Sequence, residues 1–218
     1  MLINPVLLSR MKKNSYIASG YGLLYNWYAV DTGLLTPTGW HIPTLSDWNS
    51  LISFCGGGSI AGGKLKKVGT EFWNAPNVGA TDDYMFSAIG GVFRTFTSGD
   101  FLNRGDAGIY GDITEFDSTR NYFHLFPVGG TSLITDKDGK ANGLFIRCIK
   151  DTSDWVEGET VTDIDGNIYP TVKIGTQVWM AADFRVTKYN NGVSIPNVTN
   201  NLVWIALTTG AYCNYNNL

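Results

Sequence analysis

The sequence predicts an α+β fold that is rich in loops, and three observations support this prediction. Glycine is abundant, with 26 of 218 residues, and the chain carries 7 Trp, 11 Tyr and 11 Phe. Short runs of β-branched and aromatic residues recur between turn signals, a pattern typical of short strands. A stretch that begins at Thr44 instead has the apolar spacing of a helix. We therefore expect short strands and few helices around an aromatic core.

The opening segment from Tyr21 to Trp48 holds six aromatic residues, interleaved with Gly and Pro. This much aromatic surface would cause aggregation in water, so we expect it to form the core. Thr44 is a suitable helix N-cap with Asp47 three residues later. Apolar residues then follow at helical spacing: Leu45, Trp48, Leu51, Ile52 and Cys55. Glycines 56–58 should end this helix, and a short basic turn is expected at Ile60–Val68.

After a loop at Glu71–Thr81, five short strands are predicted: Met85–Ile89, Gly91–Phe96, Gly108–Ile113, Asn121–Val128 and Leu144–Ile149. Asp136–Gly139 has the composition of a hairpin turn between the last two. The acidic stretch Asp151–Glu159 is typical of a linker. Strand character then resumes in five segments: Thr160–Asp163, Asn167–Lys173, Gln177–Val186, Ser194–Val198 and Ala211–Tyr215.

Composition argues against several classes of protein. The formal net charge is −3 and 16% of residues are charged, so no basic face for nucleic acid is expected. No apolar run approaches the ~20 residues that cross a bilayer. At the N-terminus the apolar patch precedes the charged residues, the reverse of a secretory signal, so no signal peptide is expected. The cysteines Cys55, Cys148 and Cys213 lack CxxC spacing; we expect buried thiols, with a Cys148–Cys213 disulfide as the alternative.

Two blocks of the chain resemble the Fibrobacter succinogenes major paralogous domain, a family of gut Bacteroidetes and their phages. The first block comprises Tyr21–Val30, Gly39–Thr44, Gly62–Lys66, Phe86–Ala88, Gly90–Gly91 and Arg147–Cys148. The second comprises Thr162–Asn167, Val172–Gly175, Val178–Ala181, Thr187–Asn190 and Thr209–Cys213. The resemblance implies a C-type-lectin-like fold, close to the formylglycine-generating-enzyme branch.

The two blocks stand in the reverse of the family's order, which predicts a circular permutation. The predicted parts are an N-terminal arm at 1–14, the C-terminal part of the domain at 15–150, a linker at 151–160 and the N-terminal part at 161–218. Completion of each domain by swapping between chains is the second arrangement. A fragment of a tandem array is the third, and it would leave tryptophans such as Trp179 and Trp204 exposed.

No catalytic set is visible in the sequence. We expect His41 to be structural and His124 to lie in a strand with its side chain toward solvent. Cys148 and Cys213 do not match the copper-binding motif of formylglycine-generating enzymes. Asp163–Asn167 imitates a calcium loop but lacks the acidic twelfth position, so a β-turn is expected. We therefore predict no enzyme activity, no cofactor and no metal.

The resemblance places the exposed ligand face of the fold between residues 94 and 128, where this chain departs from the family pattern. The candidate contact residues are Arg94, Phe96, Arg104, Asp106, Tyr110, Asp112, Phe116, Arg120 and Tyr122. Such side chains on a rigid scaffold suit adaptable recognition, although a merely substituted loop explains them equally well.

The expected function is a binding or adhesion module, displayed on a phage virion or otherwise extracellular. Its expected partners are a protein or glycan on a host surface, other virion proteins through residues 1–14, and further copies of itself. Nucleic acid and membrane insertion are not expected. The alternatives are a structural decoration protein of the virion, a secreted bacterial adhesin and a formylglycine-generating-enzyme-like enzyme.

Overall fold

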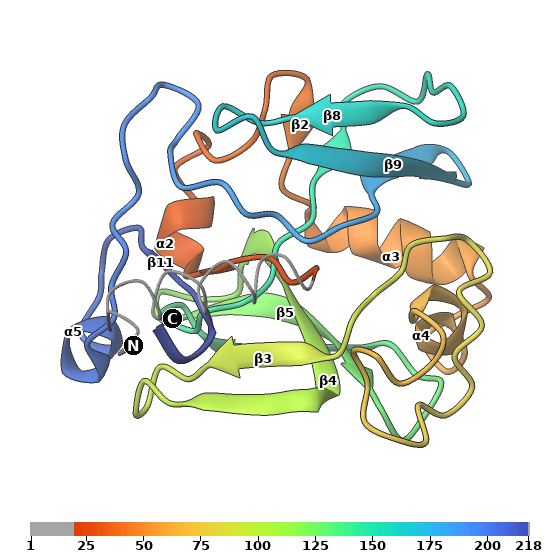
Figure 1. Cartoon of the computed structure of the whole chain (residues 1–218), viewed down its shortest axis with the longest axis horizontal. Helices are drawn as coiled ribbons and strands as arrows, with labels where there is room; N and C mark the ends of the chain where they lie inside the picture. The colour runs from red at the N-terminus through yellow and green to blue at the C-terminus, as the bar shows by residue number, and fades with distance from the viewer. Residues whose placement is uncertain (1–19, 218) are drawn as a thin grey trace, which may run out of the picture.

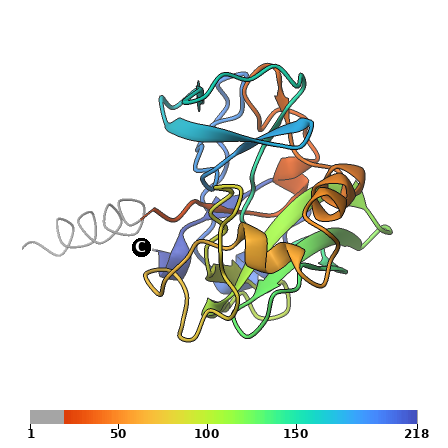
Figure 2. The same ribbon diagram turned by 90° about the vertical axis from the view of Figure 1, so that its right-hand side faces the viewer.

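The computed structural model describes residues 20–217, so the predicted arm at 1–14 lies outside the described residues. The fold is mixed α+β, with 14% of residues in helices and 32% in strands, which confirms the predicted class. Figure 1 shows a four-stranded sheet at the bottom, with α3 and α4 on the right and a second sheet above. Figure 2 shows the same two levels from the right-hand side.

Within the described residues the longest helix is α3 (Leu45–Phe54), and it begins and ends where the sequence predicts. Thr44 accepts a hydrogen bond from the Asp47 backbone N–H, and the Asp47 side chain accepts one from the Thr44 N–H, a complete capping box. Gly56 and Gly57 follow with φ of 97° and 100°, a conformation that ends the helix. The remaining helical segments are short: α2 (Trp27–Val30), α4 (Ala61–Leu65), α5 (Asn201–Ile205) and the 3-10 turn η1 (Tyr215–Asn217).

The four-stranded sheet is antiparallel, in the order β3 (Gly91–Arg94), β4 (Phe101–Glu115), β5 (Arg120–Pro127) and β6 (Ile134–Gly139). Asp136–Gly139 therefore lies inside a strand, and the predicted hairpin turn is wrong. The side chains of Asp136 and Lys137 are exposed, while the backbone pairs with β5. The predicted strand at Met85–Ile89 is also wrong, because Met85 and Ser87 have positive φ and the Asp82 carboxylate binds the Ser87 N–H and hydroxyl.

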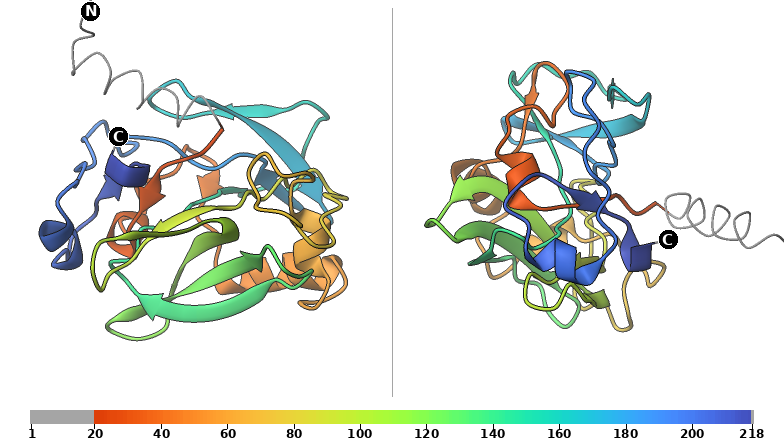
Figure 3. Two further views of the ribbon diagram at one scale, coloured as in Figure 1. Left: turned by 60° about the horizontal axis from the view of Figure 1, so that its bottom comes forward. Right: turned by 90° about the vertical axis from the view of Figure 1, so that its left-hand side faces the viewer.

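The second sheet has the order β2 (Trp40–His41), β7 (Ile149–Lys150), β10 (Gln177–Met180), β9 (Ile168–Ile174) and β8 (Thr160–Thr162). β10 pairs with β7, which precedes the segment Asp151–Glu159, and with β9, which follows that segment. Trp179 of β10 lies opposite Ile149 of β7. A two-stranded sheet joins β1 (Leu24–Tyr25) to β11 (Tyr212–Cys213). Figure 3 shows the dark-blue C-terminal segment beside the orange-red opening segment.

Most of the other predicted strands are shorter than expected. Leu144 and Phe145 form isolated bridges instead of a strand, since they pair with different partners, Tyr25 and Tyr110. Ser194–Val198 likewise contributes isolated bridges, and α5 is a helix that the sequence analysis missed.

Tryptophan side chains from both parts of the chain meet in the core. Trp48 and Trp179 are fully buried with ring centroids 5.0 Å apart, and Trp204 is also fully buried. Cys55, Cys148 and Cys213 are buried free thiols, as predicted. Burial raises the pKa of Cys55 to about 11 and that of Cys213 to about 12, so both stay protonated at neutral pH. Within residues 20–217, no helix combines the length and the apolar character needed to span a bilayer.

Candidate functional site

Three of the nine predicted contact residues are buried, and Arg94 is the clearest correction. Its side chain is fully buried on β3, and its guanidinium donates to the carbonyls of Gly99 at 2.9 Å, Val198 at 2.6 Å and Thr199 at 2.9 Å. It also lies 4.4 Å from the ring centroid of Trp204. Arg94 therefore joins β3 to the C-terminal part of the chain and contacts no ligand surface.

Tyr110 and Asp112, both on β4, are the other two buried candidates. The Tyr110 hydroxyl accepts a hydrogen bond from the Ile89 N–H at 3.1 Å, and the ring is fully buried. Asp112 is 1% exposed: it lies two residues after Tyr110 on β4, on the same core-facing side of the strand, where it meets His124. Neither residue can line an exposed face.

The six remaining candidates fall into three separate places on the structure. Arg104 and Asp106 are exposed near Asn74, whose amide donates to the Asp106 carboxylate at 2.8 Å. The Arg104 guanidinium also contacts the hydroxyls of Tyr21 and Tyr215. Phe96 lies over Gly139 at the end of β6. The structure therefore does not bring the predicted face together as one surface.

Phe116, Arg120 and Tyr122 do come together, at the end of the β4–β5 hairpin, and Lys137 of β6 joins them. These four residues are called the hairpin-tip cluster. The Phe116 and Tyr122 rings meet edge to face with centroids 5.5 Å apart. The Arg120 guanidinium and the Lys137 ammonium lie 4.7 and 4.8 Å from the Phe116 ring centroid. Phe116 is 40% exposed, so the cluster presents an aromatic ring between two cations to solvent.

The loop that carries Phe116 is held in shape by Asp117. One Asp117 oxygen accepts hydrogen bonds from the backbone N–H groups of Thr119 and Arg120, each at 2.9 Å. The other accepts from the Arg120 guanidinium at 2.9 and 2.7 Å. These hydrogen bonds, that of Arg120 first, hold the pKa of Asp117 well below its ordinary value. The carboxylate therefore stays ionised and keeps the tight turn at neutral pH.

Lys140 anchors the base of the hairpin tip from below. Its ammonium pairs with the Glu115 carboxylate and donates to the Ser118 carbonyl at 3.2 Å. Its backbone N–H donates to the Thr119 carbonyl at 3.0 Å. The Lys140 side chain is 5% exposed and its ammonium lies 4.1 Å from the Trp27 ring centroid. Lys140 thus connects the hairpin tip to the core, so the conformation of the tip does not rest on the hydrogen bonds of its own short loop alone.

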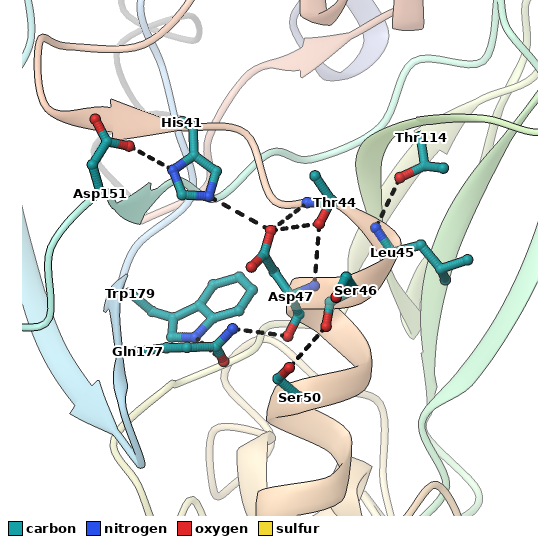
Figure 4. Close-up of polar contacts among 10 residues, drawn as sticks. All are labelled: His41, Thr44, Leu45, Ser46, Asp47, Ser50, Thr114, Asp151, Gln177 and Trp179. Atoms are coloured by element: carbon teal, nitrogen blue, oxygen red, sulfur yellow. Dashed lines mark hydrogen bonds and ion pairs between the residues drawn. The ribbon is translucent and has the colours of Figure 1, made fainter.

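The end of β4 is also fixed to the start of α3. The Thr114 hydroxyl accepts a hydrogen bond from the Leu45 N–H at 2.8 Å (Figure 4). The Ile113 N–H donates to the Pro43 carbonyl at 3.1 Å, and the Ile113 carbonyl accepts from the Trp27 indole at 3.0 Å. These bonds position the hairpin relative to the helix, so the tip cluster has a rigid support.

His124 lies in β5 as predicted, but its side chain is fully buried, so its predicted exposure to solvent is wrong. Its imidazole stacks on Trp48 with ring centroids 4.3 Å apart. One ring nitrogen lies 3.0 Å from the Asp112 carboxylate and the other 3.1 Å from the Thr135 hydroxyl. Burial lowers the pKa of His124, an effect that Asp112 partly offsets. With both nitrogens in hydrogen bonds, the ring supports the fold.

His41, the other histidine, lies between two carboxylates (Figure 4). Its Nδ1 is 2.7 Å from Asp151 and its Nε2 is 3.5 Å from Asp47, the residue that also caps α3. The imidazole therefore joins the first residue of the predicted linker to the N-terminal turn of α3. The side chain is 41% exposed, and its ring nitrogens face partners that stabilise the fold.

The structure offers no assembled metal site among residues 20–217, where no group of three or more His, Cys, Asp or Glu side chains converges. In the calcium-like stretch, the Asp163 carboxylate accepts hydrogen bonds from the N–H groups of Asp165 at 3.0 Å and Asn167 at 2.9 Å. Its second oxygen accepts from the Tyr169 hydroxyl at 2.5 Å. These bonds make the stretch a closed turn, as predicted.

Comparison with known proteins gives one match. The family model of the Fibrobacter succinogenes major domain matches residues 7–150, so the match begins inside the predicted arm and ends at the predicted linker. No curated protein and no solved structure matches the chain. Because the match covers more than half of the chain, the protein belongs to the Fibrobacter succinogenes major domain family.

Proposed function

We propose that this protein is a non-enzymatic binding or adhesion module that contacts a protein or glycan on a host surface through the hairpin-tip cluster. The observation that carries the proposal is an exposed Phe116 ring held between Arg120 and Lys137 on an anchored hairpin. Aromatic and Arg side chains dominate the binding energy of many interfaces. A loop that is already ordered loses little conformational entropy on binding. Arg120 also keeps donors for a partner's oxygen atoms.

The proposed setting is the surface of a phage virion, with residues 1–14 contacting other virion proteins. These residues lie outside the described part of the chain, so the setting rests on the sequence. A structural decoration protein is the alternative proposal. A bacterial adhesin and a formylglycine-generating-enzyme-like enzyme are weaker ones, and the buried, protonated thiols of Cys148 and Cys213 make poor copper ligands as they stand.

The test is binding of the purified, labelled protein to host cells, compared with two variants at the tip. Phe116→Ala and Arg120→Ala should each weaken binding roughly 10- to 30-fold, the loss typical of a central interface residue. Leu202→Ala is the matched control, because Leu202 is 75% exposed on α5, a separate element from the hairpin. Full binding by both tip variants would refute the role of the cluster. Virion attachment without any host binding would favour the decoration protein.

We further propose that the fold is C-type-lectin-like and circularly permuted within one chain. Support comes from β10, which pairs with β7 and β9 in one sheet, and from β1, which pairs with β11. A single chain completes both pairings, which favours permutation over swapping between chains. Trp179 and Trp204 are fully buried, which argues against two incomplete fragments.

A reconnected variant tests the permutation. It would begin at residue 159, run to Leu218, continue through a short Gly/Ser linker to residue 15 and end at residue 150. Chains tolerate new ends at exposed loops, so this variant should be a folded monomer with the near-UV spectrum of the natural order. An unfolded or obligately dimeric product would contradict intrachain permutation.

A further inference from the structure

A groove of about 780 Å³ runs between the outer face of α3 and the turn of the β9–β10 hairpin, away from the hairpin-tip cluster. One wall consists of small polar residues that recur at helical spacing along α3: Ser46, Asn49, Ser50 and Ser53. The opposite wall is formed by Gly175, Thr176 and Gln177. Every residue that lines the groove is uncharged.

The polar groups at the mouth of the groove are held in place. The Gln177 amide donates to the Asp47 carbonyl at 3.0 Å, and its oxygen lies 3.3 Å from the Trp179 indole nitrogen, which donates to it (Figure 4). The Ser50 hydroxyl donates to the Ser46 carbonyl at 2.9 Å. The Gln177–Asp47 hydrogen bond connects the β9–β10 hairpin to α3, and the Ser50–Ser46 hydrogen bond lies within α3. Both walls of the groove are therefore held in position by hydrogen bonds of the protein itself.

An exposed aromatic ring closes one end of the groove. Phe54, the last residue of α3, is 52% exposed and lies over Gly175, where a Cβ would come within 2.8 Å of the ring. Gly175 also has a φ of 62°, so the turn requires glycine both for its backbone and for the space that the ring fills. On its other side the Phe54 ring lies 5.5 Å from that of Tyr84. The ring is thus positioned by two neighbours while half of it faces solvent.

We propose that this groove binds a neutral oligosaccharide. The volume falls within the range of small-molecule sites. Hydroxyl and amide groups both donate and accept hydrogen bonds, as sugar hydroxyls require, and an aromatic ring offers an apolar surface for the C–H groups of a sugar ring. A phosphate or carboxylate would find no cation in the lining, and an apolar peptide would find Phe54 as its one exposed apolar anchor. This site is independent of the hairpin-tip proposal.

The experiment titrates the labelled full-length protein with tri- to hexasaccharides of glucose, mannose, galactose, xylose and N-acetylglucosamine, and with oligogalacturonate as an acidic probe. Amide NMR shifts report the site of binding. At about 10 mM sugar, a site with a Kd on the order of 1 mM is mostly occupied. At least one neutral sugar should shift the amides of α3 and of residues 175–177, and oligogalacturonate should not.

Three variants make the test specific to the groove. Ser53→Tyr places a large ring in the groove from an exposed helix position and should abolish the shifts, while Phe54→Ala should weaken binding roughly tenfold. Leu202→Ala, on α5 and outside both proposed sites, should bind the sugar as the wild type does. The proposal is overturned if no neutral sugar in the panel binds, if oligogalacturonate alone binds, or if Ser53→Tyr binds normally while remaining folded by circular dichroism. Loss of host binding in Arg120→Ala with intact sugar binding separates the two sites.

Discussion

Replacement of Arg94 by leucine should destabilise the fold more than any exposed charge substitution in the chain. The guanidinium makes four hydrogen bonds, to the carbonyls of Gly99, Val198 and Thr199 and to the Asn201 side chain at 2.7 Å. Leucine fills part of the volume but offers no donor, so the acceptors on Gly99, Val198 and Asn201 lose the guanidinium, while the Thr199 carbonyl keeps its hydrogen bond from the Asn217 amide at 2.7 Å.

The magnitude follows from the burial of these groups. A buried acceptor left without a partner costs about 1–3 kcal/mol. Water can reach some of the freed carbonyls, because residues 199–201 lie near the surface. We therefore expect a loss of about 3–5 kcal/mol in the free energy of unfolding. For a chain of this size that corresponds to a fall in Tm of roughly 6–20 °C.

Urea unfolding followed by tryptophan fluorescence measures this loss, because fully buried Trp204 lies 4.4 Å from the Arg94 guanidinium. Arg120→Leu is the matched control: Arg120 is an exposed arginine at the hairpin tip, and its loss should change stability by less than about 1 kcal/mol. Arg94→Lys should be intermediate, since an ammonium cannot reach all four acceptors. If Arg94→Leu unfolds within about 1 kcal/mol of the wild type, Arg94 does not hold the two parts of the chain together.

Three further predictions concern buried groups. Burial lowers the pKa of His124, so below about pH 6.5 the unfolded chain binds a proton at this imidazole more readily than the folded chain does. The free energy of unfolding should therefore decrease as the pH falls below about 6.5. Denaturation curves of His124→Gln should show a smaller decrease. Lys66→Met should cost about 2–4 kcal/mol, as three carbonyls, each within 3.0 Å of the ammonium, lose their donor; chemical denaturation measures it. Gly91→Ala should lower Tm far more than Gly129→Ala, because a Cβ at 91 would meet the Phe145 ring at 1.9 Å and one at 129 meets nothing within 4 Å.

The parts of the fold that the sequence predicts well are those set by local chemistry. The capping box at Thr44 and Asp47 determines where α3 begins, and the turn around Asp163 determines the β8–β9 hairpin. β6 was not predicted because most of its side chains are exposed and its strand conformation comes from backbone pairing with β5. The exposed residues of such an edge strand have the composition of a turn, and nothing in them indicates which strand they pair with.

The candidate site was likewise predicted only in part from the sequence. Phe116, Arg120 and Tyr122 were predicted and meet at the hairpin tip. Lys137 was missed because it lies opposite Tyr122 on the unpredicted β6. Asp112 was misplaced because it shares the core-facing side of β4 with Tyr110, two residues before it, and composition does not reveal which side of a strand faces the core. The signal that could have placed it is His124, a second ionisable side chain that stands among the apolar residues Phe123, Leu125 and Phe126 of β5.

The two buried arginines explain why this fold has one defined arrangement of its parts. Arg94 donates to residues 198 and 199, while Arg147 binds Asp183 at 2.8 Å and the Ser87 carbonyl at 2.9 Å. Each guanidinium thus connects residues on both sides of Asp151–Glu159. Apolar contacts tolerate small shifts, whereas a guanidinium must meet its acceptors in fixed directions. Because that arrangement is set inside the molecule, the exposed side chains of Phe116, Ser118 and Thr176 are free to vary, and substitutions there should change what the protein binds while leaving its fold intact.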